Sequence, residues 1–298
     1  MAGKLTVYLR LMRPANIVTS VADVLAGIAI SGYFLNLSFT TASLYPVVLL
    51  CLSTMGLYGG GIVFNDVFDA ELDKKERPER AIPAGLISLK EASMLGAFLL
   101  LWGIGFAFSH SPQSGLIAVG ISFFALLYNK VSKHYAFFGP LNMGLCRGLN
   151  LILGISVITT AIMQWYFVAI FPVIYIFSIT MISQGEVHGG SKRNMYIGGF
   201  LYSVVATGIR SIGLKLEQNT WVTFAFILPF VLMIFIPLAK AINNPIGPNV
   251  GKAVKAGVIS LILMDAAIAA AFGAVYPALF IVCLLPLSMW FAKRFAVT

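Results

Sequence analysis

Long apolar stretches separated by short polar segments run through the whole chain. A helix needs about 20 apolar residues to cross the hydrocarbon core of a bilayer. Ten stretches of about that length occur, at residues 15–35, 44–66, 92–110, 113–129, 139–161, 164–184, 196–213, 220–239, 252–273 and 275–292. Because only a short break near Pro277 divides the last two, nine spans and a re-entrant segment are the alternative. The pattern predicts an all-α integral membrane protein with nine to ten transmembrane helices.

The composition supports this prediction. Apolar residues make up 59% of the 298 residues and charged residues only 10%, whereas soluble domains carry roughly 25% charged residues. So few charges cannot cover a water-facing surface, which excludes a soluble globule, a disordered chain and a coiled coil.

The basic residues indicate the orientation. Seventeen of the 20 lysines and arginines fall on one side of the predicted spans, two on the other side and one within a span. Cytoplasmic loops carry the excess of basic residues in membrane proteins. With ten spans, we therefore expect both termini and the loops after the second and sixth spans to be cytoplasmic, in the cytoplasmic membrane. These loops account for the net charge of +9 without a nucleic-acid partner.

Acidic residues gather directly after the second stretch, in the segment FNDVFDAELDKKERPERAIPAG at residues 64–85. The candidate metal ligands are Asn65, Asp66, Asp69 and Asp73. At 3.6 residues per turn, the three aspartates would share one face of a continuing helix. Like charges at that spacing repel one another, and carboxylate and amide oxygens are hard ligands that suit Mg²⁺. The alternative is a solvated acidic helix end, with Lys74, Lys75 and Arg77 as simple partners.

Two arginines follow on a loop rich in proline and glycine. Arg77 and Arg80 flank Pro78, and Pro83 and Gly85 end the segment. A guanidinium group can donate two parallel hydrogen bonds to phosphate oxygens. Carboxylates for a metal beside arginines for phosphate are the arrangement that a diphosphate site needs.

The pattern N-D-x-x-D-x-x-x-D followed by R-P-x-R-x-x-P-x-G resembles the first aspartate-rich motif of the UbiA superfamily of intramembrane prenyltransferases. Arg13-Pro14-x-Asn16 and the pair Tyr128 and Lys133 are also similar to that family, whereas Ala81 stands where the family usually has proline. The resemblance covers most of the chain. It implies helices around a central cavity and Mg²⁺-dependent use of an isoprenyl diphosphate.

The resemblance also implies a second acidic motif after the sixth span, and here the chain departs from the family. The segment at residues 183–190 reads SQGEVHGG, followed by Lys192 and Arg193, and contains no D-x-x-x-D. It resembles a subgroup of the superfamily linked to the Ebo gene cluster. Glu186 is a candidate ligand of a second Mg²⁺, and His188 is a candidate proton acceptor. The alternative for His188 is a loop histidine that forms a hydrogen bond with the backbone. Because the second motif is altered, the sequence does not decide whether the protein turns over a substrate.

Charged residues also lie within the predicted spans, where each charge costs about 2.5–3.5 kcal/mol on insertion scales. Arg147 either binds the diphosphate from the cavity wall or forms an ion pair with Asp23 or Asp265. For the two acids a structural role is the stronger interpretation. Phe68 and Tyr128 could line a prenyl channel, with packing as the alternative.

We predict a single domain at residues 1–298 with two related halves, about 1–138 and 139–298. The two halves are inferred from a weak sequence similarity between Arg13-x-x-Asn16 and Arg147-x-x-Asn150, which coincidence could also produce.

The predicted function is Mg²⁺-dependent transfer of an isoprenyl group to a hydrophobic, aromatic acceptor. Glu186 and His188 would assist the chemistry. The candidates for neutralising the diphosphate are Arg77, Arg80, Lys133, Arg147, Lys192 and Arg193. The alternatives are a non-catalytic relative that binds a prenylated lipid, a membrane transporter, and a CDP-alcohol-type synthase, whose D-G-x-x-A-R signature is absent. The pattern does not indicate an oligomeric state.

Overall fold

The computed structural model describes residues 4–36, 40–184 and 191–295, and these form helices and no strand. The first half contains α1 (Lys4–Met12), α2 (Pro14–Ile30), η1 (Tyr33–Asn36), α3 (Thr41–Phe68), α4 (Ala70–Glu76), α5 (Leu89–His110), α6 (Pro112–Lys130) and η2 (Ser132–His134). The second contains α7 (Phe138–Ile155), α8 (Thr159–Trp165), η3 (Tyr166–Ala169), α9 (Ile170–Ser183), α10 (Lys192–Lys215), α11 (Thr220–Asn243), α12 (Gly247–Ala271) and α13 (Val275–Arg294).

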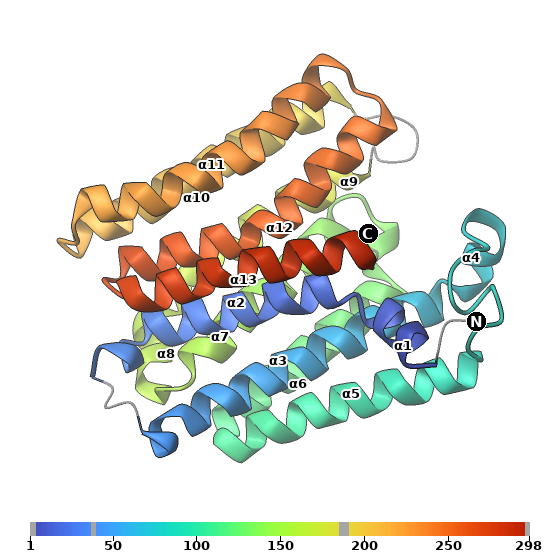
Figure 1. Ribbon diagram of the computed structural model, residues 1–298, viewed down its shortest axis with the longest axis horizontal. Coiled ribbons are helices and arrows are strands. Elements are labelled where there is room, and N and C mark those ends of the chain that lie inside the picture. The colour runs from blue at the N-terminus through green and yellow to red at the C-terminus, as the bar shows by residue number, and fades with distance from the viewer. Residues whose placement is uncertain (1–3, 37–39, 185–190, 296–298) are drawn as a thin grey trace.

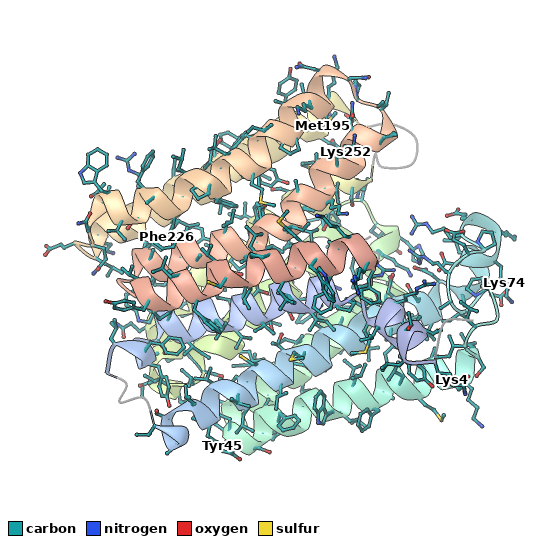
Figure 2. The ribbon with its side chains drawn as sticks, in the orientation of Figure 1. Lys4, Tyr45, Lys74, Met195, Phe226 and Lys252 are labelled. Carbon is teal, nitrogen blue, oxygen red and sulfur yellow. The ribbon has the colours of Figure 1, made fainter. Side chains whose placement is uncertain are left out.

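The long helices lie roughly side by side in one bundle (Figure 1). Both ends of the chain lie at the end of the bundle that carries α4 (Figure 1). Figure 2 places Lys4, Lys74 and Lys252 toward that same end, whereas Tyr45 and Phe226 lie toward the other. These three lysines are among the basic residues that we assigned to one side, and they lie toward one end of the molecule.

Each of the ten apolar stretches coincides with a helical segment, so the all-α membrane fold is confirmed. Among the described residues, seven helices are long and apolar enough to cross a membrane, or eight if α1 and α2, bent by 50°, form one span. Two of the helices predicted as spans, α6 and α7, are not among them; α7 carries the polar Arg147 and Asn150 and is largely buried. The count of nine to ten spans stays a prediction.

Two glycines let α2 and α7 approach backbone to backbone. A Cβ atom at Gly27 would lie 2.2 Å from the carbonyl oxygen of Leu151, and one at Gly154 would lie 2.2 Å from that of Val24. Small residues at such crossings allow helices in lipid to pack closely. This contact brings the polar residues one turn away on each helix within hydrogen-bonding distance of one another.

Candidate active site

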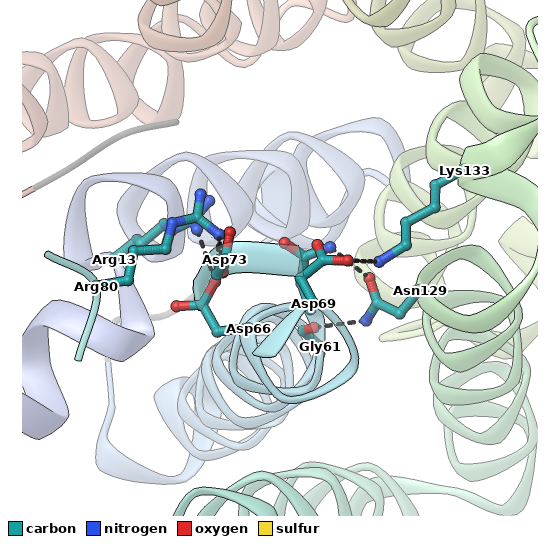
Figure 3. Close-up of polar contacts among 9 residues, drawn as sticks. Arg13, Gly61, Asp66, Asp69, Asp73, Arg80, Asn129 and Lys133 are labelled. Carbon is teal, nitrogen blue, oxygen red and sulfur yellow. Dashed lines mark hydrogen bonds and ion pairs between the residues drawn. The ribbon is translucent and has the colours of Figure 1, made fainter. Parts of the chain in front are cut away.

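The acidic motif lies at the end of α3 and in α4, and two arginines from other parts of the chain meet it there (Figure 3). Asp66 Oδ1 accepts hydrogen bonds from Arg13 at 2.9 Å and from Arg80 Nη1 at 3.3 Å. The same Arg80 nitrogen donates to Asp73 Oδ2 at 2.8 Å. The aspartates are buried and the two arginine side chains are 13–15% exposed, so these ion pairs are partly shielded from water.

The backbone directs both arginines to this place. Arg13 occupies the bend between α1 and α2 with φ 47° and ψ 72°, a left-handed conformation that costs energy in a residue other than glycine. It also precedes Pro14, which disfavours the helical conformation and separates α1 from α2. Arg80 lies on the loop after α4 that returns to Asp73, and Gly85 supplies a positive φ of 69° further along this loop.

Asp69 pairs with a different cation from the other two aspartates, so the predicted acidic face is shared between two cation partners. α3 ends at Phe68, and Asp69 stands between α3 and α4. Its carboxylate pairs with Lys133 in η2, on the side of the site away from Arg80 (Figure 3). Lys74 pairs with exposed Glu71 at 2.6 Å and not with these aspartates.

Asn65 is fixed by a residue to which we had given no role. Its Nδ2 donates to Asn129 Oδ1 at 3.1 Å, and Asn129 Nδ2 donates to the carbonyl oxygen of Gly61 at 2.8 Å. Asn129 is 3% exposed and ties α6 to α3. A buried amide beside Tyr128, at the end of an apolar stretch, was the only signal that the sequence offered for it.

The donors fit a hard divalent cation. Arg80 Nη1 touches one carboxylate oxygen of Asp66 and one of Asp73, so a positive centre already bridges the two groups. Within the part of the chain that the structure describes, no cluster of three histidine, cysteine or acidic side chains is arranged to hold a metal. Mg²⁺ usually keeps several waters and takes one or two protein carboxylates together with substrate phosphates, so two carboxylates meet its requirement.

A cavity of about 270 Å³ opens beside this acidic site. Its wall is formed by α2, α3, α6, α7, α9 and α12, and it includes Arg13, Asn65, Tyr128 and Asn129. Apolar side chains form much of the wall, among them Leu57, Ile121, Met143, Ile176, Ile179 and Leu261. The expected central cavity is therefore present.

Arg147 lies at the inner end of the cavity and is 1% exposed. Its Nη1 donates to Asp23 Oδ2 at 2.5 Å, and its Nη2 donates to the hydroxyls of Thr19 at 2.6 Å and Tyr58 at 2.8 Å. The ion pair that we held as the structural alternative is therefore formed, with Asp23 as the partner. Arg147 still belongs to the cavity wall.

The remaining candidates lie apart from this site. Arg77, Lys192 and Arg193 are exposed, and no contact between their side chains and the aspartates is found in the described residues. Phe68 is 44% exposed, packs against Phe64 and lies outside the cavity wall, whereas Tyr128 belongs to it. Glu186 and His188 lie outside the described residues.

A model of the UbiA prenyltransferase family matches residues 24–248, about three quarters of the chain. The chain belongs to this family. The match includes the acidic motif, Lys133 and Arg147, whereas Arg13 and Asp23 precede it and Asp265 follows it.

Among curated proteins, the chain is similar to digeranylgeranylglyceryl phosphate synthases. That of Methanococcoides burtonii is 35% identical over 159 residues, which cover 53% of this chain and 57% of the relative. That of Sulfolobus acidocaldarius is 28% identical over 235 residues, covering 76% of this chain and 75% of the relative. The first relatives are thus matched over only about half of their length.

Solved structures share the fold. A UbiA homologue from Aeropyrum pernix K1 superposes with a TM-score of 0.69 at 15% identity, covering 85% of this chain and 96% of that one. A UbiA homologue from Archaeoglobus fulgidus, bound to DMAPP and Mg²⁺, superposes with a TM-score of 0.65 at 19% identity, covering 90% of this chain and 99% of that one. The helical bundle around a cavity is therefore the UbiA fold.

Proposed function

We propose that this protein transfers an isoprenyl group from an isoprenyl diphosphate to a lipophilic acceptor within the membrane, with Mg²⁺ as cofactor. The observation that carries the proposal is the pair of buried carboxylates, Asp66 and Asp73, bridged by one arginine nitrogen beside an apolar cavity. Family membership and the Mg²⁺-bound homologue from A. fulgidus support it.

Asp66 and Asp73, which now share Arg80 Nη1, would hold Mg²⁺, and the amide oxygen of Asn65 is a further candidate donor. Asp69 and, in the undescribed segment, Glu186 are proposed as further ligands. When bound, the ion would neutralise charge on the leaving diphosphate. Arg80, released from the carboxylates, would turn its guanidinium onto phosphate oxygens.

Further cations are available around the same site. Arg13 and Lys133 are within contact of the carboxylates now and would stabilise the charge that develops as the allylic C–O bond breaks. Arg77, Lys192 and Arg193 remain proposed phosphate partners that reach the site only if their exposed side chains turn inward.

The apolar part of the cavity wall would receive the carbons next to the diphosphate and exclude water from the electron-poor allylic carbon. Tyr128 lies on that wall near the acidic site and presents a ring face that stabilises positive charge. Phe68 lies outside this wall, so we assign no channel role to it. His188 is proposed to take the proton that the acceptor releases.

The acceptor is lipophilic. The name of the archaeal relatives indicates that their product is a glycerol phosphate lipid, and the sequence pattern favoured an aromatic acceptor. Both classes belong in the assay. We place the site on the cytoplasmic side of the cytoplasmic membrane, because basic residues lie toward that end of the bundle.

The test uses the protein in lipid nanodiscs with Mg²⁺, labelled geranylgeranyl or farnesyl diphosphate, and acceptors of both classes. We expect pyrophosphate release and a prenylated product, and a loss of about a hundredfold or more in Asp66→Asn and Asp73→Asn. Glu71→Gln is the matched control, since its carboxylate lies in the same motif but is 85% exposed. Mg²⁺-dependent binding of the diphosphate without any product would instead identify a non-catalytic binding protein.

A further inference from the structure

Three ionisable residues, Arg147, Asp23 and Asp265, lie buried at the inner end of the cavity. Arg147 and Asp23 form an ion pair with side chains 1% and 0% exposed. Asp265 on α12 is also 0% exposed and is a close neighbour of Asp23. One arginine balances one carboxylate, so the charge state of Asp265 decides whether this end is neutral or negative.

The hydrogen bonds indicate that the cluster is neutral. Asp23 Oδ2 accepts from Arg147 and from Asn150 Nδ2, the latter at 2.8 Å, which marks Asp23 as the ionised acid. Asp23 Oδ1 and both oxygens of Asp265 have no hydrogen-bond donor among the described residues. Two facing carboxylates without a donor would repel each other in a medium of low dielectric constant. A proton on Asp265, donated to Asp23 Oδ1, supplies the missing hydrogen bond and removes the second charge.

Tyr58 covers the positive side of this cluster. The Arg147 Cζ atom lies 4.4 Å from the centre of the Tyr58 ring, and the Tyr58 hydroxyl accepts a hydrogen bond from Arg147 Nη2. Within the described chain no acceptor is found for the hydroxyl proton of Tyr58, which lines the cavity. The inner end thus offers a hydrogen bond to a ligand but no net charge.

This end is separate from the diphosphate region. Tyr58 and Asn65 both line the cavity and lie two turns apart on α3, a rise of about 10 Å. A diphosphate at the acidic site therefore leaves the Tyr58 end free for a second molecule.

We propose that the inner end of the cavity is an uncharged polar subsite that selects an acceptor with a neutral hydroxyl or carbonyl group over one with a carboxylate or phosphate there. The inference rests on the proposed function, because it assigns the class of acceptor. An anion at this end would be desolvated and would find Arg147, the cation that the described residues place there, already neutralised by Asp23.

The test uses two photoreactive probes of equal shape, 4-benzoylbenzyl alcohol and 4-benzoylbenzoate. Nanodisc protein is first saturated with Mg²⁺ and dimethylallyl thiolodiphosphate, whose short chain fills the acidic site without reacting and without reaching the Tyr58 end. After irradiation, mass spectrometry measures labelling of the peptides that contain Tyr58 and Arg147. We expect the alcohol to label these peptides about tenfold more than the benzoate, the loss expected when a charge is left unpaired.

Two variants test the charge argument. Asp23→Asn combined with Asp265→Asn leaves Arg147 without a carboxylate, and the preference should reverse toward the benzoate. Asp265→Asn is the matched control, since an amide donates to Asp23 as the protonated acid does, and the preference should stay as in the unmodified protein.

A third variant tests the same subsite if the double variant Asp23→Asn with Asp265→Asn does not fold. Tyr58→Phe should lower labelling by the alcohol about five- to tenfold, whereas Tyr202→Phe, which removes a buried hydroxyl away from the cavity, should not. Equal labelling by both probes, labelling of neither in the cavity, or an unchanged preference in the double variant Asp23→Asn with Asp265→Asn would overturn the proposal. Labelling requires no turnover, so a lack of pyrophosphate release would refute the proposed function without altering this result.

Discussion

Replacing Arg80 by alanine tests the central ion-pair network. Arg80 is the cation that Asp73 contacts, so Asp73 loses this partner when Arg80 is replaced. Asp66 still pairs with Arg13. The Asp73 side chain is 5% exposed, so the substitution leaves a carboxylate that water reaches poorly. We expect Arg80→Ala to reduce the free energy of unfolding markedly.

The magnitude follows from burial. Removing one partner of a buried ion pair costs about 3–5 kcal/mol. Because the Arg80 side chain is 15% exposed, the lower end, about 3 kcal/mol, applies. In Arg80→Ala with Asp73→Asn the unpaired charge is gone, and about 2 kcal/mol should return.

The assay is reversible unfolding of the purified protein in mixed micelles, followed by circular dichroism. Lys74→Ala is the control, because its pair with Glu71 is exposed on both sides and should contribute less than about 0.5 kcal/mol. Mg²⁺ at millimolar concentration should stabilise Arg80→Ala more than the unmodified protein, since it can bridge the freed carboxylates. A cost below about 0.5 kcal/mol for Arg80→Ala, or additive effects of the two substitutions, would refute the network.

Three further predictions concern the bundle interior. Arg147→Leu should cost about 3–5 kcal/mol in the same unfolding assay, and adding Asp23→Asn should recover part of it. Gly27→Ala should cost about 1–3 kcal/mol, since its methyl carbon would lie 2.2 Å from a carbonyl oxygen of α7, whereas Gly105→Ala meets nothing within 4 Å and should not destabilise. Infrared spectra should contain the C=O stretch of a protonated carboxylic acid that disappears in Asp265→Asn; an identical spectrum would contradict the neutral cluster.

The helices were predictable because each span needs a long apolar stretch, and every such stretch became a helix. The residues at which the helices end were less predictable. The first stretch was expected to reach residue 35, but α2 ends at Ile30, where a turn through Gly32 with φ 78° begins. Small and apolar residues continue beyond that turn, so the apolar pattern alone does not mark it.

The acidic residues of the site were predictable from the sequence, but the distant residues that contact them were not. Asp66 contacts Arg13, 53 residues away, and Asn65 contacts Asn129, 64 residues away. Spacing within one segment carries no information about which distant side chains meet it. The helix break at Asp69 was missed because the periodic argument assumed that the helix continues.

The pairing of every aspartate at the site with a cation has a consequence for selectivity toward small ions. A lone divalent ion meets carboxylates that are already engaged, and a lone inorganic anion meets guanidinium and ammonium groups that are engaged as well. Only a molecule that arrives with both signs of charge, a metal together with a pyrophosphate ester, can replace all of these contacts at once. We therefore expect Mg²⁺ alone or free phosphate alone to leave these ion pairs in place.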